Sequence, residues 1–303
     1  MINENARASA PRTSGSLQPT SDLLHSAFLL PEEPVIRIRP SRPFRFINLS
    51  EVWAYRDLFY FFVWRDLKVR YKQTVLGALW VILQPLLMTL IFVVFLGIVV
   101  HVPTEHVPYP LFLYAALLTW TFFSNAIASS SYSLVVNAPM ITKVYFPRVI
   151  VPVAAVAVRL SDFLIASVIL LVLLVYYGVR PSWNLFMLPP LVVHLTILAT
   201  GIGLWLSALN VKYRDVGTVI PVLLQLWMFV SPIIYPASLV PARWRMIYNL
   251  NPLVGIIENV RASLFGLPFD RGSMISSAVI TLLILVYSAY VFHRMEDEFA
   301  DVV

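Results

Sequence analysis

Long uninterrupted runs of apolar residues dominate this sequence and restrict what it can fold into. A helix that crosses the hydrocarbon core of a bilayer needs about 20 mostly apolar residues. We expect six such helices, at residues 76–100, 109–136, 152–177, 187–209, 218–235 and 274–292. Because the runs are continuous rather than alternating with polar residues, they predict helices and not barrel strands.

The composition supports an all-α integral membrane protein. Hydrophobic residues make up 59% of the chain, charged residues only 13%, and the mean hydropathy is +0.79, whereas a soluble domain is typically about 25% charged. Most of the net charge of +6 lies within residues 1–72, which favours membrane orientation over nucleic acid binding, so we expect no nucleic acid partner. The chain has no cysteine, which excludes a disulfide framework and a thiolate metal site.

The distribution of Lys and Arg predicts that both termini lie in the cytosol. The segment before the first span carries 11 of the 22 cations, and the loop before the second span has none. The even-numbered loops and the C-terminal end carry Lys143, Arg148, Lys212, Arg214 and Arg294. The stretch 236–273 also holds cations, but longer segments obey the positive-inside rule less strictly.

Three regions are expected along the chain. Residues 1–45, rich in Pro, Ser and Arg, predict a disordered cytosolic tail. Residues 46–75 predict an amphipathic helix on the membrane surface, with an apolar stripe at Leu58, Phe59, Phe62 and Val63 and a charged face formed by Arg56, Arg65, Asp66, Lys68 and Arg70. The alternative is a charged collar that only fixes orientation. Residues 76–303 would form the six-helix transmembrane domain.

Motifs for catalysis, nucleotide binding or metal binding are missing from the sequence. There is no G-x-x-x-x-G-K-[ST] loop, no G-x-G-x-x-G pattern and no pair of histidines at H-x-x-x-H spacing. We therefore expect no metal and no cofactor in this chain. The charged pair Arg159 and Asp162 lies inside the third predicted span, where charge is costly. It would be either a structural ion pair or a place where a polar substrate or a moving helix engages.

Aromatic residues within the spans suggest a path for a substrate. Aromatic faces with polar tips suit sugar rings, and Trp120, Phe123, Tyr132 and Trp227 are the candidates for a polar conduit. Interfacial belts and ordinary packing are the alternative for each of them.

A ladder of small residues at Ala199, Gly203 and Ser207 lets another helix approach closely. It predicts packing within the bundle, with a subunit interface as the alternative.

The external stretch between the fifth and sixth spans predicts one or two short half-embedded helices. Ile247, Leu250, Val254 and Ile257 recur near helical spacing, and Glu258 can pair with Arg261 three residues later. Non-helical backbone at membrane depth survives only where protein or a water-filled cavity covers it. Functionally, we interpret this stretch as a cap over an exit path.

Two short cytosolic loops mix cations with aromatic residues. In MITKVYFPRVIVP, Pro147 interrupts a possible one-turn helix whose Lys143, Tyr145, Phe146 and Arg148 would face the cytosol and insert into a cleft of a soluble partner. Positive-inside charge with interfacial aromatics is the alternative. The second such loop is NVKYRDVGT.

Six motifs together resemble one known family. RDLKVRYKQTVLGALWVILQPL, VYFPRVIVP, LWLSALNVKYRDV, SPIIYP, YNLNPLVGIIENVR and the terminal FADVV are similar to the membrane subunits of type-2 ATP-binding cassette exporters. The branch that exports lipid-linked polysaccharide, most of all lipopolysaccharide O-antigen, is the most similar. The resemblance runs from about residue 50 to the C-terminus and keeps the order of the motifs.

The resemblance implies a homodimer with two copies of a separate nucleotide-binding subunit, in a bacterial inner membrane. ATP and Mg would belong to that partner. The loop with Lys143, Tyr145, Phe146, Pro147 and Arg148 would be the main coupling element, and Tyr213, Arg214 and Asp215 a second contact. The helix before Leu76 would be the interface helix. Asn251, Pro252, Glu258 and Arg261 would belong to periplasmic gate helices, where Ala262 and Ser263 depart from the bulkier residues usual in the family.

We therefore expect a transporter subunit that moves an undecaprenyl-diphosphate-linked polysaccharide to the periplasmic face. Arg65, Lys68, Arg70 and Lys72 could attract the diphosphate. A pump for a drug or a small lipid shares this fold and is the main alternative. A membrane-embedded glycan polymerase or ligase would need paired acids on the outer side, where the sequence offers only isolated ones.

Overall fold

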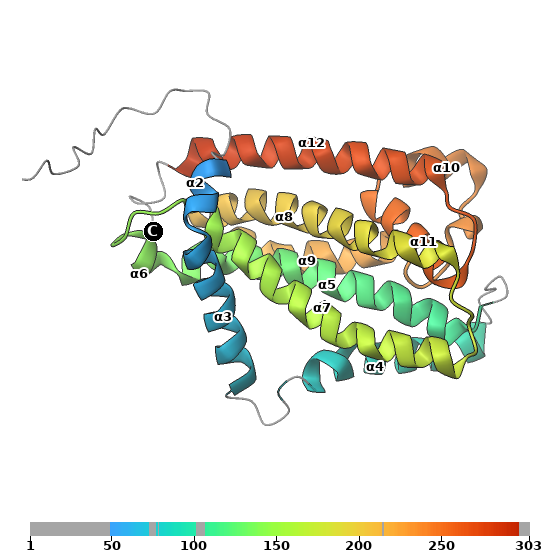
Figure 1. The fold of residues 1–303 in the computed structure, drawn as a ribbon. Coiled ribbons are helices and arrows are strands. Elements are labelled where there is room, and N and C mark those ends of the chain that lie inside the picture. The colour runs from blue at the N-terminus through green and yellow to red at the C-terminus, as the bar shows by residue number, and fades with distance from the viewer. Residues whose placement is uncertain (1–48, 73–76, 78, 101–106, 214, 297–303) are drawn as a thin grey trace, which may run out of the picture. The chain divides into compact units, whose positions relative to one another are not determined.

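The computed structural model describes residues 49–72, 77, 79–100, 107–213 and 215–296, and their regular elements are all helical, as predicted (Figure 1). The predicted tail, residues 1–45, lies outside the described residues. The elements are α2 (Leu49–Ala54), α3 (Arg56–Lys72), α4 (Leu79–Phe92), the π-helix η1 (Val93–Val100), α5 (Tyr109–Val136), α6 (Ala138–Ile141), α7 (Ile150–Tyr176), the 3-10 helix η2 (Trp183–Met187), α8 (Leu188–Lys212), α9 (Asp215–Val230), the 3-10 turn η3 (Ala237–Leu239), α10 (Ala242–Tyr248), α11 (Pro252–Phe265) and α12 (Arg271–Glu296).

Five helical segments of the described chain are long and apolar enough to cross a membrane. They are Leu79–Gly97, Tyr109–Val136, Ile150–Tyr176, Trp183–Lys212 and Arg271–Glu296. The fifth predicted span, 218–235, is not among them, because α9 has only 16 residues and ends at Val230. Pro232 has no backbone N–H and disfavours helical geometry in the residue before it, so the helix ends there.

Helix α5 lies at the centre of the bundle and packs against α7 and α8. The buried Tyr114 hydroxyl donates a hydrogen bond to the Ala166 carbonyl of α7 over 2.9 Å. On the other side, a Cβ atom at Gly203 of α8 would lie 2.5 Å from Ser130 Oγ of α5. The ladder that includes Gly203 is buried against α5, which confirms the prediction of packing within the bundle.

Two short helices, α10 and α11, lie in the stretch 236–273 and confirm the prediction made for it. Helix α11 is the longer of the two. Asn251 begins it as an N-cap whose side chain accepts a hydrogen bond from the Leu253 N–H over 3.1 Å, and Pro252 takes the first turn, where no N–H is needed. Gly266 ends it with a φ of 71°, which glycine adopts without strain. The sequence therefore fixes both ends of this helix locally.

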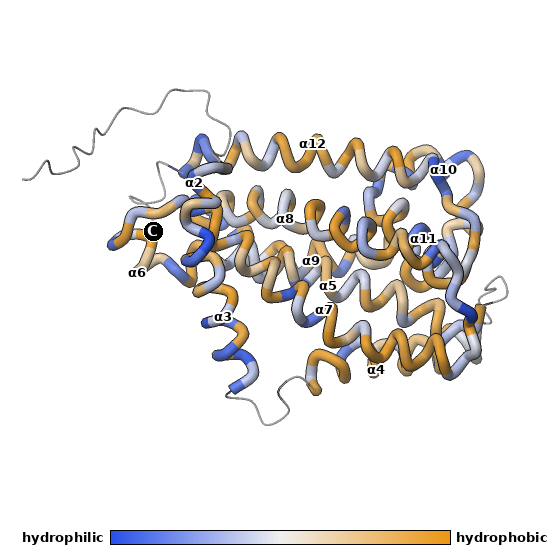
Figure 2. The backbone as a smooth tube through the Cα atoms, viewed as in Figure 1, coloured by the Kyte–Doolittle hydropathy of each residue, from blue (hydrophilic) through white to orange (hydrophobic). Residues whose placement is uncertain are grey.

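The predicted single helix at 46–75 is two helices, α2 and α3, with a break at Tyr55. The predicted apolar stripe of α3 does face the bundle: Phe62 is buried, and Leu58, Phe59 and Val63 pack around it. Figure 1 shows α2, α3, α6 and the C-terminal end of α12 at one end of the bundle, with α10 at the other. In Figure 2 hydrophilic residues gather at these two ends, while the long helices are mostly apolar.

Candidate functional site

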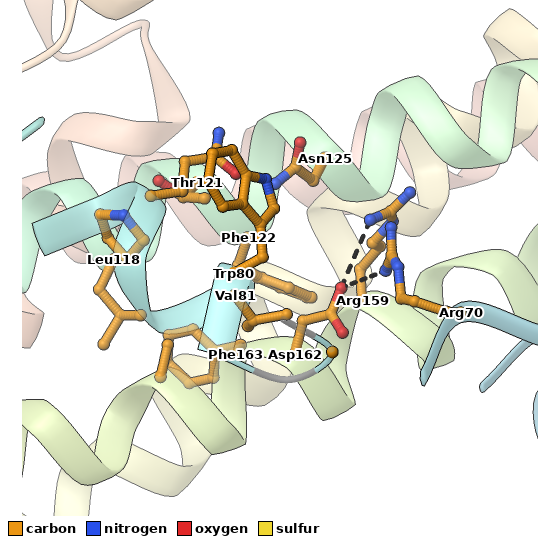
Figure 3. Close-up of a pocket in the computed structure, with 14 residues that line it drawn as sticks. Arg70, Trp80, Val81, Leu118, Thr121, Phe122, Asn125, Arg159, Asp162 and Phe163 are labelled. Carbon is orange, nitrogen blue, oxygen red and sulfur yellow. Dashed lines mark hydrogen bonds and ion pairs between the residues drawn. The ribbon is translucent and has the colours of Figure 1, made fainter. Parts of the chain in front are cut away.

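A cluster of charged residues joins α3 to α7 and forms the centre of the candidate site (Figure 3). The Asp162 carboxylate of α7 pairs with Arg70 of α3 and, over 3.4 Å, with Nη1 of Arg159. Its other oxygen accepts a hydrogen bond from the Tyr71 hydroxyl over 2.6 Å. Ser129 of α5 accepts a hydrogen bond from Arg159 Nε over 2.6 Å. The predicted pair of Arg159 and Asp162 is thus confirmed, as part of a larger network that links three helices.

Tyr71 and Ser129 are the members of this network that sequence reasoning missed. Burial and the hydrogen bond to Asp162 raise the pKa of the Tyr71 hydroxyl, so it stays protonated and donates at neutral pH. No local spacing signals these contacts, because Tyr71 lies 91 residues from Asp162 and Ser129 lies 30 residues from Arg159.

A cavity of about 530 Å³ lies on one side of the charged cluster, and we call it the first cavity. The two arginines, Asp162 and Asn125 contribute its polar side, as Figure 3 shows. Its remaining wall is largely apolar and includes Trp80, Val81, Pro85, Leu118, Phe122 and Phe163.

A second cavity of about 770 Å³ lies between α3, α5 and α7, and Arg70 and Arg159 line it too. Its polar lining also includes Arg65, Asp66, Ser129, Tyr132, Ser133 and Asn137. The arginine pair therefore borders two cavities, and both combine polar groups with apolar side chains.

The four cations predicted to attract a diphosphate point in different directions. Arg70 belongs to the charged cluster, and Arg65 lines the second cavity, where its Nη2 donates to Asn137 Oδ1 over 2.9 Å. Lys68 instead lies over the Trp64 ring, 4.3 Å from its centroid, and Lys72 is exposed. Of the four, Arg65 and Arg70 therefore line the cavities.

The predicted coupling loop differs from the sequence expectation in two respects. Its short helix, α6, ends at Ile141, before the cations, so Lys143 to Arg148 lie in an irregular, non-helical loop. Phe146 does not face outward: it is 3% exposed and packs on Phe62 of α3 with ring centroids 6.0 Å apart. Packing against α3 removes the apolar ring of Phe146 from solvent, so the side chain does not take the outward position that the sequence predicts. Tyr145 is 82% exposed and Lys143 is exposed, as predicted.

The same loop contacts the end of α12. The Arg148 backbone N–H donates to the Glu296 carboxylate over 3.1 Å, and the predicted Pro147 precedes it. In the second cytosolic loop Tyr213 is 55% exposed and Asp215 begins α9. Arg214 lies outside the described residues.

The candidate conduit residues are split between the core and the second cavity. Trp120, Phe123 and Trp227 form one aromatic cluster, with Phe123 5.8 Å from Trp120 and 5.3 Å from Trp227 between ring centroids. Phe123 is fully buried and none of the three lines either cavity. Tyr132 lines the second cavity and is 41% exposed. Whether a substrate passes these residues stays a prediction.

The predicted pair of Glu258 and Arg261 exists, at 3.0 Å, and Arg261 is only 2% exposed. Its guanidinium also donates to the Ile233 carbonyl over 2.8 Å and lies 3.4 Å from the centroid of the Phe112 ring. Arg261 thus ties α11 to α5 and to the segment after α9.

Asn251, another predicted gate residue, connects α9 with α11. Its side chain accepts a hydrogen bond from Trp227 Nε1 and donates one to Ser231 Oγ, each over 3.0 Å. Pro252, the fourth gate candidate, is buried. Among the described residues no group of three or more His, Asp or Glu side chains could hold a metal ion.

Comparison with known proteins decides the family. Residues 57–265 match the family model described as ABC-2 type transporter. The chain belongs to this family. It is therefore a multi-pass membrane permease, which confirms the prediction of a transporter subunit rather than an enzyme, and membership implies that an ATPase subunit partners it.

The relatives of this ABC-2 permease are export proteins for polysaccharides. It is 30% identical over 259 residues, 84% of this chain and 98% of the relative, to the O-antigen export system permease protein RfbA of Myxococcus xanthus. It is 32% identical over 240 residues, 78% of this chain and 92% of the relative, to a protein of the same name from Klebsiella pneumoniae. The polysialic acid transport protein KpsM of Escherichia coli is 24% identical over 239 residues, 77% of this chain and 91% of the relative.

Proposed function

We propose that this permease is the transmembrane subunit of an ATP-driven exporter that moves an O-antigen-like, undecaprenyl-diphosphate-linked polysaccharide from the cytosolic to the periplasmic face of a bacterial inner membrane. One observation carries the proposal: an arginine pair borders two cavities, each of which is lined by both polar and apolar side chains. A substrate with a long apolar tail, a diphosphate and a glycan presents the same three kinds of surface. The names of the O-antigen and polysialic acid relatives support this substrate class.

Six spans per subunit are part of the proposal, with α9 as the fifth. A helix of 16 residues is about 24 Å long, somewhat shorter than the roughly 30 Å hydrocarbon core. The apolar turn after it, from Ser231 to Pro236, and the buried α11 complete the crossing. An even number of spans then leaves both termini in the cytosol, as the distribution of Lys and Arg predicts.

The complex would be a homodimer with two ATPase subunits that bind ATP and Mg, while this chain holds no cofactor. The exposed Lys143, Tyr145 and Tyr213 form the docking surface for the ATPase in this proposal. Phe146 would transmit movement of the coupling loop to α3, because its buried ring packs on Phe62.

Depletion of the protein in its native cell tests the proposed function. The lipid-linked glycan is then located by its access to a periplasm-confined glycosidase. Full-length polymer that accumulates on the cytosolic side supports export. Short units on the periplasmic side would instead indicate a polymerase or ligase, and an unchanged glycan would indicate a pump for a drug or small lipid.

A further inference from the structure

The carboxylate of Asp162 occupies the position between two arginines that come from different helices. Arg70 reaches it from α3 and Arg159 from the preceding turn of α7. The Arg159 contact is loose, since 3.4 Å exceeds the roughly 2.7–2.9 Å typical of charge-assisted hydrogen bonds. Arg159 is held in place mainly by Ser129, over 2.6 Å through Nε. Its Nη groups therefore have capacity for a better acceptor.

The cluster also lies at a depth that suits a lipid headgroup. Trp80 and Val81, in the first turn of α4, line the same cavity as Asp162, so the cluster is level with the start of a spanning helix. Helix α7 begins at Ile150, 12 residues earlier, and thus extends about 18 Å past the cluster toward the loop end. The arginines would then lie at the level where the apolar run of α4 begins and part-way along the span of α7, with the apolar side chains of the first cavity beside them.

A diphosphate is a better partner for two guanidinium groups than one carboxylate is. It offers more acceptor oxygens and more negative charge, and each guanidinium can bind phosphate oxygens bidentately. The carboxylate, once displaced, would not be left without a donor, because the Tyr71 hydroxyl still bonds its other oxygen over 2.6 Å. The exchange thus leaves the carboxylate with one hydrogen-bond donor, which reduces the cost of losing its two arginine partners.

We propose that Asp162 is a displaceable counter-ion: it holds Arg70 and Arg159 between transport cycles, and the diphosphate of the lipid-linked substrate replaces it on both arginines. The proposal rests on the proposed function and names the residues that bind the headgroup. The lipid tail lies along the first cavity, and the sugars next to the diphosphate lie in the second. The diphosphate is released when Asp162 pairs again with both arginines. Asp162 therefore weakens substrate binding and speeds the transport cycle.

Binding and transport of the charge-neutral variant test this role. The full permease–ATPase complex in nanodiscs is titrated with undecaprenyl diphosphate, and export is measured in cells. The Asp162→Asn variant should bind this lipid roughly tenfold more tightly, because the carboxylate no longer competes with the diphosphate for the two arginines. It should also export the substrate more slowly. Arg159→Gln should bind roughly tenfold more weakly. A purely structural ion pair would not give tighter binding together with slower export.

Matched controls come from an exposed ion pair at the start of α3. Arg56 and Asp57 of α3 lie 3.9 Å apart with side chains 60% and 94% exposed, so Asp57→Asn and Arg56→Gln make the same charge changes away from the cavities. Both should leave binding and export unchanged. A tightening by Asp57→Asn equal to that of Asp162→Asn would overturn the proposal as a general charge effect.

A second measurement keeps the charged cluster intact. The chain has no cysteine, so Val69→Cys, at an exposed position that lines the second cavity beside Arg70, gives a single site for maleimide labelling. Undecaprenyl diphosphate that carries a short glycan should slow labelling at least about fivefold, as expected for a site mostly occupied by ligand, because its first sugars would lie in this cavity, while uncharged undecaprenol should not. Protection by inorganic pyrophosphate as strong as that by the lipid would overturn the claim of a lipid-linked ligand.

The outcomes separate this inference from the proposed function. If the wild type binds undecaprenyl diphosphate but Asp162→Asn binds equally or less tightly, or Val69→Cys is not protected, the counter-ion role is wrong and the substrate class stands. If the wild type binds no lipid diphosphate, the inference and the proposed substrate class are both wrong.

Discussion

Replacing Arg261 with methionine should destabilise the protein by about 3 kcal/mol, because the guanidinium is the shared partner of three segments. It is 2% exposed and bonds the Glu258 carboxylate over 3.0 Å and the Ile233 carbonyl over 2.8 Å. Removing one partner of a buried ion pair typically costs about 3–5 kcal/mol. The lower end applies here, since Glu258 is 25% exposed and keeps a hydrogen bond from the Ala237 N–H over 3.2 Å.

The free energy of unfolding of the purified permease would be measured by denaturation with SDS in mixed micelles, followed by tryptophan fluorescence. Arg180→Met is the matched control, because Arg180 is exposed and its loss should change stability by less than about 0.5 kcal/mol. Arg261→Lys keeps the positive charge but loses the planar guanidinium, so its loss of unfolding free energy should lie between those of Arg180→Met and Arg261→Met.

A double-mutant cycle separates the ion pair from the rest of the contact. In a Glu258→Gln background, Arg261→Met should cost about 1 kcal/mol less, because no carboxylate is left without its cation. If Arg261→Met in the wild-type background lowered the free energy of unfolding by less than about 1 kcal/mol, the reasoning would be refuted. An effect equal to that of Arg180→Met would refute it too.

Three further predictions concern the loop end and the packing of α5. Phe146→Ala should destabilise the protein by about 3–5 kcal/mol, since the ring is 3% exposed; an unchanged midpoint in the SDS titration would contradict its buried position. Gly203→Ala should cost about 1–3 kcal/mol, because the new Cβ would lie 2.5 Å from Ser130 Oγ; a variant as stable as wild type would show that α5 and α8 are less tightly packed. Lys143→Glu combined with Tyr145→Ala should leave insertion intact but uncouple ATP hydrolysis from export, because both residues are exposed at the proposed docking surface; normal export per ATP would remove them from it.

The sequence by itself determined the elements that depend on neighbouring residues. Apolar runs longer than the bilayer core predict the helical class, and the spacing of Glu258 and Arg261 predicts their ion pair within one helix. Asn251, Pro252 and Gly266 likewise set the ends of α11 through local backbone geometry. Such signals act within a few residues, so they can be interpreted without knowing what the helix packs against.

Only the tertiary structure decided which residues from distant parts of the chain come into contact. Phe146 has the spacing of an exposed loop residue, yet it is buried, because the apolar face of α3 lies beside it. Arg70 and Lys68 are two residues apart on one helix, but only Arg70 reaches the Asp162 of α7, since successive helical side chains point in different directions. The charged cluster depends on contacts between residues 30 to 92 positions apart, and only the packing of α3, α5 and α7 brings them together.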